Sequence, residues 1–143
     1  MNTELLDKIS NHLRNGELVH KRFEFGTINF GTLKHNPDYP LCAWVGDAVG
    51  ELPVIFPEHF KFYQQECYPY NQIIVYKDST KAYHIEIDLA RFLDIPIHDV
   101  RSLFMPDKKR YWANNTVLTD DATKEIVADS IDAYILYRMN LID

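Results

Sequence analysis

Two prolines, Pro40 and Pro53, bracket the segment that most constrains how this chain can fold. Between them runs a series of small, apolar and cysteine residues, Leu-Cys-Ala-Trp-Val-Gly-Asp-Ala-Val-Gly-Glu-Leu. Proline is favoured in the first turn of a helix, whereas it breaks a helix when it falls in the interior. The pattern therefore predicts a helix over residues 40–52 that ends at Pro53.

Length and composition predict a single domain over residues 1–143. A chain of 143 residues can bury one sizeable core, but it is too short for two ordinary ones. No run approaches the roughly 18 apolar residues that cross a bilayer. The beginning of the chain carries Glu4 and Asp7 in place of the basic and then apolar stretch of a secretion signal. We therefore expect a cytoplasmic protein that does not contact a membrane.

Helical periodicity is clearest near the two ends of the chain. Apolar residues recur at helical spacing over residues 3–15, with Asn2 or Thr3 as the cap and Gly16 as the stop. Thr119 is predicted to cap the last helix. That helix carries a broad apolar face, which core packing and self-association explain equally well, made of Ile126, Val127, Ile131, Tyr134, Ile135, Tyr137 and Leu141.

The middle of the chain mixes short helices with strand-like segments. Pro57 is predicted to open one short helix, and a second is expected over residues 96–104. Residues 83–93 fit both an alternating strand and a longer helical stripe, and we favour the helix. The best strand is residues 73–76, expected to pair with residues 21–25. Together these elements predict an α+β fold: a mainly helical single domain with a small two- or three-stranded antiparallel sheet.

The chain is acidic, with a formal net charge of -6 and a pI near 5.4. This charge argues against direct nucleic-acid binding, which draws most of its strength from cations that neutralise phosphates. It suits either simple solubility or a basic protein partner. Five carboxylates lie on the outer face predicted for the last helix, where they form a solvated surface or imitate a phosphate backbone: Asp120, Asp121, Glu125, Asp129 and Asp132.

The predicted ligand- or partner-binding site is a basic, aromatic group in the loop expected at residues 107–118. Its members are Lys108, Lys109, Arg110, Tyr111 and Trp112. Lysine and arginine pair with phosphate, and Tyr111 and Trp112 can stack on a base or on an arginine. An ordinary surface loop with its rings tucked into the core gives the same pattern.

The cysteines give two interpretations. Cys42, at a predicted helix start that favours the thiolate, can act as a nucleophile if His35 or His59 lies within reach as its base. A lone cysteine in an apolar run is more often a small core residue. Cys42 and Cys67 lack C-x-x-C spacing, so both are expected as reduced thiols.

Other catalytic and metal-binding patterns are weak. His84, Glu86 and Asp88 would share one face only on a strand, where they could hold a divalent metal, and the helix favoured over residues 83–93 separates them. The sequence has no glycine-rich phosphate loop, no H-E-x-x-H, no G-x-S-x-G and no zinc spacing. We therefore expect a protein that is not an enzyme and holds neither a cofactor nor a metal.

The order of these segments resembles a family of small uncharacterised phage and bacterial proteins that carry C-G-T-x-x-C-x-x-G in the middle and L-F-x-P later. Residues 42–50 and residues 103–106 (Leu-Phe-Met-Pro) carry the resemblance, with Ala43, Trp44 and Asp47 departing from the pattern. Loss of the second cysteine at Asp47 weakens a metal or redox role. The motif residues are expected to be structural: Cys42, Gly46, Asp47, Gly50 and Pro53. The resemblance implies a phage or prophage setting and no established activity.

These observations predict a small acidic accessory protein of the phage type that binds and inhibits a host protein, for example a defence component, in the host cytoplasm. One alternative is a sink for a nucleotide signal that uses Arg110, Tyr111 and Trp112. The other is an enzyme that depends on Cys42. A host protein is expected as partner ahead of a small anionic ligand, without direct nucleic-acid binding. Self-association through the apolar faces of the first and last helices remains an open alternative.

Overall fold

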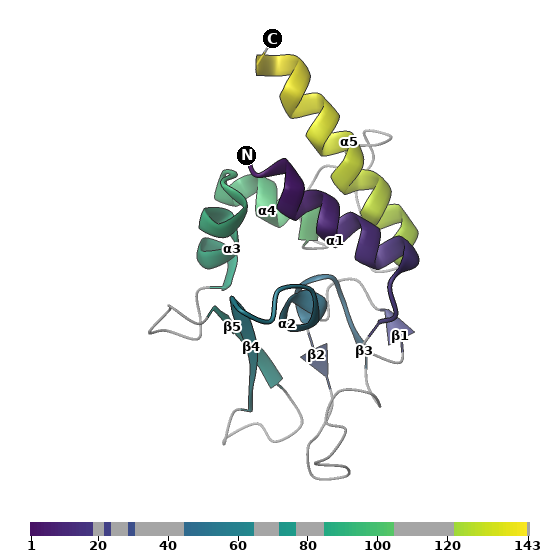
Figure 1. Ribbon diagram of the computed structural model, residues 1–143, viewed down its shortest axis with the longest axis vertical. Coiled ribbons are helices and arrows are strands. Elements are labelled where there is room, and N and C mark those ends of the chain that lie inside the picture. The colour runs from purple at the N-terminus through teal and green to yellow at the C-terminus, as the bar shows by residue number, and fades with distance from the viewer. Residues whose placement is uncertain are drawn as a thin grey trace.

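The computed structural model describes residues 1–18, 22–23, 29–30, 45–64, 72–76, 85–104 and 122–142. The elements within these ranges are α1 (Thr3–Asn15), β1 (Arg22–Phe23), β2 (Asn29–Phe30), β3 (Val45–Gly46), the 3-10 turn η1 (Val49–Glu51), α2 (Leu52–Ile55), β4 (Phe60–Gln64), β5 (Gln72–Tyr76), α3 (Ile85–Leu93), α4 (Ile97–Phe104) and α5 (Lys124–Ile142). Helices α1, α3, α4 and α5 occupy one part of the molecule, and α2 and the strands occupy the other (Figure 1).

Helix α1 has the bounds and the buried face expected from its sequence. The Asn2 side chain accepts a hydrogen bond from the Leu5 amide at 3.2 Å, as an N-cap does. At the other end, the Gly16 amide donates to the His12 carbonyl at 2.9 Å. A Cβ at Gly16 would lie 2.6 Å from His12 Nδ1 and 2.7 Å from His12 O, so this position needs a glycine for steric reasons.

The core lies where α1, α3, α4 and α5 meet α2 and the start of β4. Tyr134, Phe104 and Phe60 are among its largest fully buried side chains. Phe60 and Phe56 both contact the ring of Phe92 edge-on, with centroids 5.1 and 5.0 Å away. This edge-to-face arrangement joins the β4 end of the molecule to α3.

A tight corner over residues 94–96 joins α3 to α4. Asp94 has a φ of 55°, the left-handed conformation that often closes a helix and that aspartate tolerates better than most residues. The Ile95 amide returns to the Ala90 carbonyl at 3.0 Å. The Met1 amine lies 2.8 Å from Asp94 Oδ2, and this hydrogen bond holds the pKa of the Asp94 carboxyl below its usual value.

The predicted fold class, α+β with one small antiparallel sheet, is wrong. The described residues are mostly helical, and their strand pairs form two separate groups. In one group β1 is parallel to β3 and β2 is antiparallel to β3, with two residues in each strand. In the other, β4 and β5 pair antiparallel from Phe60↔Tyr76 to Gln64↔Gln72. Residues 73–76 thus lie in a strand as expected, but their partner is β4 instead of residues 21–25.

Two helices predicted around the prolines are also wrong. Residues 57–59 form a turn and Phe60–Gln64 is strand β4, because aromatic residues suit a strand that has a partner. Within residues 40–52, the described part begins with β3 and continues through η1. Pro53 lies in the first turn of α2 and does not end a helix. Gly46 and Gly50 disfavour a continuous helix at this place.

Candidate functional site

The surface that most needs an explanation is the C-terminal half of α5. Leu136 is 63% exposed, Met139 48% and Tyr137 42%. In Figure 1 this part of α5 extends past α1 and α4. Single exposed apolar residues are common on proteins, but a group of large ones on a protruding helix is a candidate interaction surface.

Local sequence explains why this segment is a long helix. Thr123 Oγ1 accepts a hydrogen bond from the Ile126 amide at 3.2 Å, and no glycine or proline follows until the helix ends. The helix begins at Lys124, so the predicted cap at Thr119 is wrong. Its buried side, which faces the core, consists of Val127, Ala128, Ser130, Ile131, Tyr134 and Ile135.

Polar contacts with α1 anchor the N-terminal half of α5. Ser10 Oγ donates to Asp132 Oδ1 at 2.8 Å, and Arg14 pairs with both Asp129 and Asp132. The bonds to Asp129 and Asp132 raise the pKa of the Arg14 guanidinium above its usual value. Asp132 is therefore not a purely solvated residue of an outer face, as its place in the sequence suggests.

A buried carboxylate, Asp99, holds the middle of α5 against α4. The Tyr134 hydroxyl donates to Asp99 Oδ2 at 2.6 Å, and Arg138 donates to the same oxygen at 3.3 Å. His98 Nε2 lies 3.3 Å from the other oxygen, Oδ1. The arrangement fixes the rotation of α5 just before its exposed half, because Tyr134 and Arg138 lie one turn apart on the same face.

Alkaline pH is expected to weaken this junction. Burial, followed by the hydrogen bond to Asp99, raises the pKa of Tyr134 above its usual value. Above about pH 10 the unfolded chain releases the tyrosine proton while the folded chain retains it, so stability present below that pH is lost as the pH rises. Above pH 10, Tyr134 should make the free energy of unfolding fall by about 1.4 kcal/mol per pH unit, and Tyr134→Phe should lack this contribution. Urea denaturation of both proteins between pH 8 and about 11 measures this, and identical slopes would contradict it.

A second polar group lies where η1 meets α1. Glu51 is 1% exposed, and its Oε1 lies 2.8 Å from His12 Nε2. Asp47, also 1% exposed, accepts a hydrogen bond from the Gly50 amide at 3.1 Å through Oδ1. Among the residues described, no group of three or more histidine, cysteine, aspartate or glutamate side chains could hold a metal. The geometry of His12 and Glu51 is that of a buried pair that secures α1 to η1.

The motif residues that the structure describes lie around this group. Gly46 ends strand β3, and Asp47 is buried between β3 and η1. Gly50 is buried in η1 and Pro53 in α2. Cys42 lies outside the described residues, as do Cys67, His35, His84 and the whole predicted binding group of Lys108, Lys109, Arg110, Tyr111 and Trp112.

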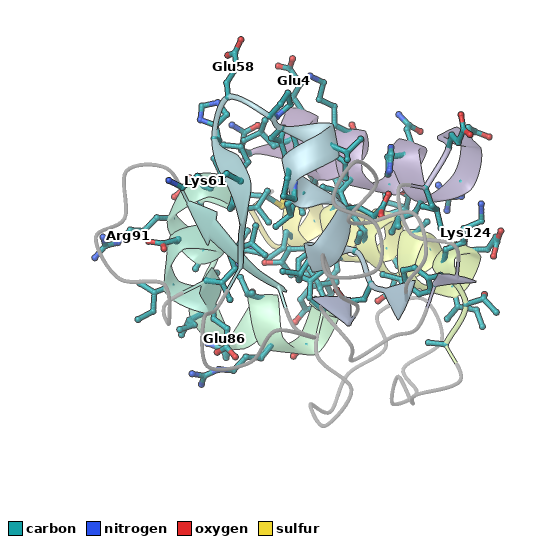
Figure 2. All side chains as sticks on the ribbon, turned by 90° about the horizontal axis from the view of Figure 1, so that it is seen from below. Glu4, Glu58, Lys61, Glu86, Arg91 and Lys124 are labelled. Carbon is teal, nitrogen blue, oxygen red and sulfur yellow. The ribbon has the colours of Figure 1, made fainter. Side chains whose placement is uncertain are left out.

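Within the described residues, the remaining candidates His59, Glu86 and Asp88 do not come together in one site. The exposed His59 lies on the turn before β4, with its ring centroid 4.9 Å from that of Phe92. Glu86 and Asp88 are on helix α3, and Glu86 Oε2 accepts a hydrogen bond from Arg101 Nε at 2.7 Å. Figure 2 shows Glu86 on the opposite side of the molecule from Glu58. In the part of the chain that the structure describes, no helix has the length and apolar character to cross a membrane.

The sequence interpretation missed Leu136 and Met139. It left open whether the apolar face of the last helix packs in the core or mediates self-association, and Ile126 and Tyr137 of that face are 36% and 42% exposed. The available signal was that apolar residues lie on opposite sides of this helix. A helix with two apolar sides is expected to contact something besides the core.

No protein-family model matches this chain, and neither a curated protein nor a solved structure does. The resemblance to small phage and bacterial proteins therefore stays a prediction.

Proposed function

We propose that this chain is a small acidic accessory protein of the phage type that binds and inhibits a host protein through the C-terminal half of α5. The observation that carries the proposal is the exposure of Leu136 and Met139, at 63% and 48%, on a helix whose opposite side is anchored in the core. An apolar helical surface of this kind binds by entering an apolar groove of its partner.

The anchoring of α5 supports binding without a large ordering cost. Asp99 fixes Tyr134 and Arg138, and Arg14 fixes the preceding turns through Asp129 and Asp132. A helix that is already held in place loses little conformational freedom when it binds. The partner is inhibited because the bound helix occupies its groove.

The two alternative functions depend on residues outside the described ranges. A nucleotide sink needs Arg110, Tyr111 and Trp112, and an enzyme needs Cys42. The described residues offer no observation that favours either function over protein binding.

The proposal predicts that polar substitution of the exposed half of α5 abolishes partner capture. The double variant Leu136→Gln/Met139→Gln should retain the fold, since the two residues are 63% and 48% exposed, yet bind the host protein at least about tenfold more weakly. Quantitative co-purification from host extract identifies the captured protein, and titration with that purified protein then gives the dissociation constants.

The matched control is Val54→Gln/Ile87→Gln. These residues are 43% and 38% exposed, and they lie on α2 and α3 instead of α5. The control is expected to capture the same protein as the unsubstituted chain. Equal loss in both double variants would show nonspecific apolar adhesion, and unchanged capture by Leu136→Gln/Met139→Gln would place the binding surface elsewhere.

A further inference from the structure

One face of α5 carries a regular stripe that is acidic in its first turns and apolar in its last ones. Its residues follow one another at intervals of four, three, four and three, which keeps them on one side of a helix. Four of them are exposed: Glu125 and Asp129 with 57% and 54% of their side chains, and Leu136 and Met139 with 63% and 48% of the residue. Asp132, which is bound to Ser10 and Arg14, is half-buried. We call this set the acidic-apolar stripe.

The acidic half of the stripe keeps a negative charge after its neighbours are counted. Arg14 pairs with Asp129 and Asp132, and Lys124 Nζ lies 3.9 Å from Glu125. Among the described residues, two cations therefore face three carboxylates. The whole chain carries a net charge of -6, so its field adds to the attraction of a cationic surface.

The apolar half is nearly free of charge. From residue 133 to residue 142 the sequence holds a single ionised side chain, Arg138, and its guanidinium already contacts Asp99 inside the junction. An apolar patch thus adjoins an acidic one along a single helix, and the two are in fixed register.

We propose that the partner presents an apolar pocket for Leu136 and Met139 and, along the same groove, a lysine- or arginine-rich patch for Glu125 and Asp129. The rise of an α-helix places Asp129 about 10 Å and Glu125 about 16 Å from Leu136 along the axis. This proposal rests on the proposed function and specifies the chemistry of its partner. The cationic patch steers the encounter and sets the direction of the bound helix.

A second copy of the chain fits the stripe poorly. Parallel pairing of two α5 helices would bring Asp129 against Asp129, which like charges disfavour. Antiparallel pairing would place the acidic half of each helix against Leu136 and Met139 of the other, where carboxylates would lose water without gaining a cation. The occupant is therefore a different protein with a basic, apolar groove.

A synthetic peptide tests this complementarity directly. The probe is a labelled helical peptide of about 20 residues, with lysines on one face of its N-terminal half and leucines on the same face of its C-terminal half. A matched peptide has glutamates in place of the lysines. Fluorescence anisotropy with the full chain should show binding of the lysine peptide at least about tenfold tighter than the glutamate peptide. Equal binding of the two peptides, or none, would overturn the proposal.

Charge reversal on the protein locates the effect. Glu125→Lys should weaken binding of the lysine peptide about 5- to 20-fold, whereas the control Glu58→Lys should change it less than about twofold. Glu58 is also exposed, and it lies far from Lys124 and the start of α5 in Figure 2. Equal effects of the two reversals would mean that only net charge matters, which contradicts a patch in register with the pocket.

The failures of the inference and of the proposed function can be told apart. If Leu136→Gln weakens capture of the host protein but Glu125→Lys behaves like Glu58→Lys, the function stands and the cationic patch is wrong. If Leu136→Gln has no effect on capture, the docking surface itself is wrong. Sedimentation of the unsubstituted chain that shows a dimer dispersed by Leu136→Gln would overturn the choice of a different protein as partner.

Discussion

Replacement of Asp99 with alanine is expected to lower the free energy of unfolding by about 3 kcal/mol. The Tyr134 hydroxyl, in a side chain with no exposed surface, donates to Asp99 at 2.6 Å and would lose its acceptor. A buried donor without an acceptor costs about 1–3 kcal/mol. Arg138 would lose its contact at 3.3 Å, but its side chain is 27% exposed and can turn to water. Urea denaturation followed by circular dichroism measures the loss.

The matched variant for Asp99→Ala is Tyr134→Phe, which removes the donor and leaves the ring. It should cost less, about 1–2 kcal/mol, because Asp99 keeps Arg138 as a partner. The loss in the double variant should be smaller than the sum of the two single losses by more than about 1 kcal/mol, because the second change finds the hydrogen bond already absent. Losses that add within about 0.5 kcal/mol would show that the two groups act independently.

The structure also shows which parts of this fold are visible in a sequence. The bounds of helix α1 are predictable because the signals lie in its own sequence. Asn2 caps the helix, Gly16 follows its end, and apolar residues recur at helical spacing between them. Strand β4 was predicted as a helix because its stabilisation comes from β5, which follows in a later segment. Pairing between strands leaves no local periodicity that would reveal the partner.

The candidate site was less predictable than the fold. The apolar content of α5 is plain in the sequence, but which of its sides remains uncovered depends on where α1 and α4 pack. The Asp99 junction joins residues 35 positions apart, and neither residue shows an unusual local pattern. The prediction of a binding site at Lys108, Lys109, Arg110, Tyr111 and Trp112 lies outside the described residues and stays a prediction.

Glu51, the residue that follows Gly50 of the motif, shows how this segment contributes to stability. Its carboxylate is buried at 1% exposure, and His12, whose side chain is 15% exposed, lies 2.8 Å from it. These two side chains join residues 39 positions apart, across the boundary between the helical part of the molecule and the part that contains the strands. Removal of His12 takes a hydrogen-bond partner away from a carboxylate that has almost no contact with water.

His12→Ala is therefore expected to lower the free energy of unfolding by about 3 kcal/mol. His12→Gln should lose only about 1 kcal/mol, because the amide of glutamine can still donate to the Glu51 carboxylate. Denaturant titration of the two variants beside the unsubstituted chain gives both values. If His12→Gln is as unstable as His12→Ala, the ring of His12 contributes through its packing against Gly16, where a Cβ would lie 2.6 Å from Nδ1. The hydrogen bond to Glu51 would then not be the interaction that holds α1 to η1.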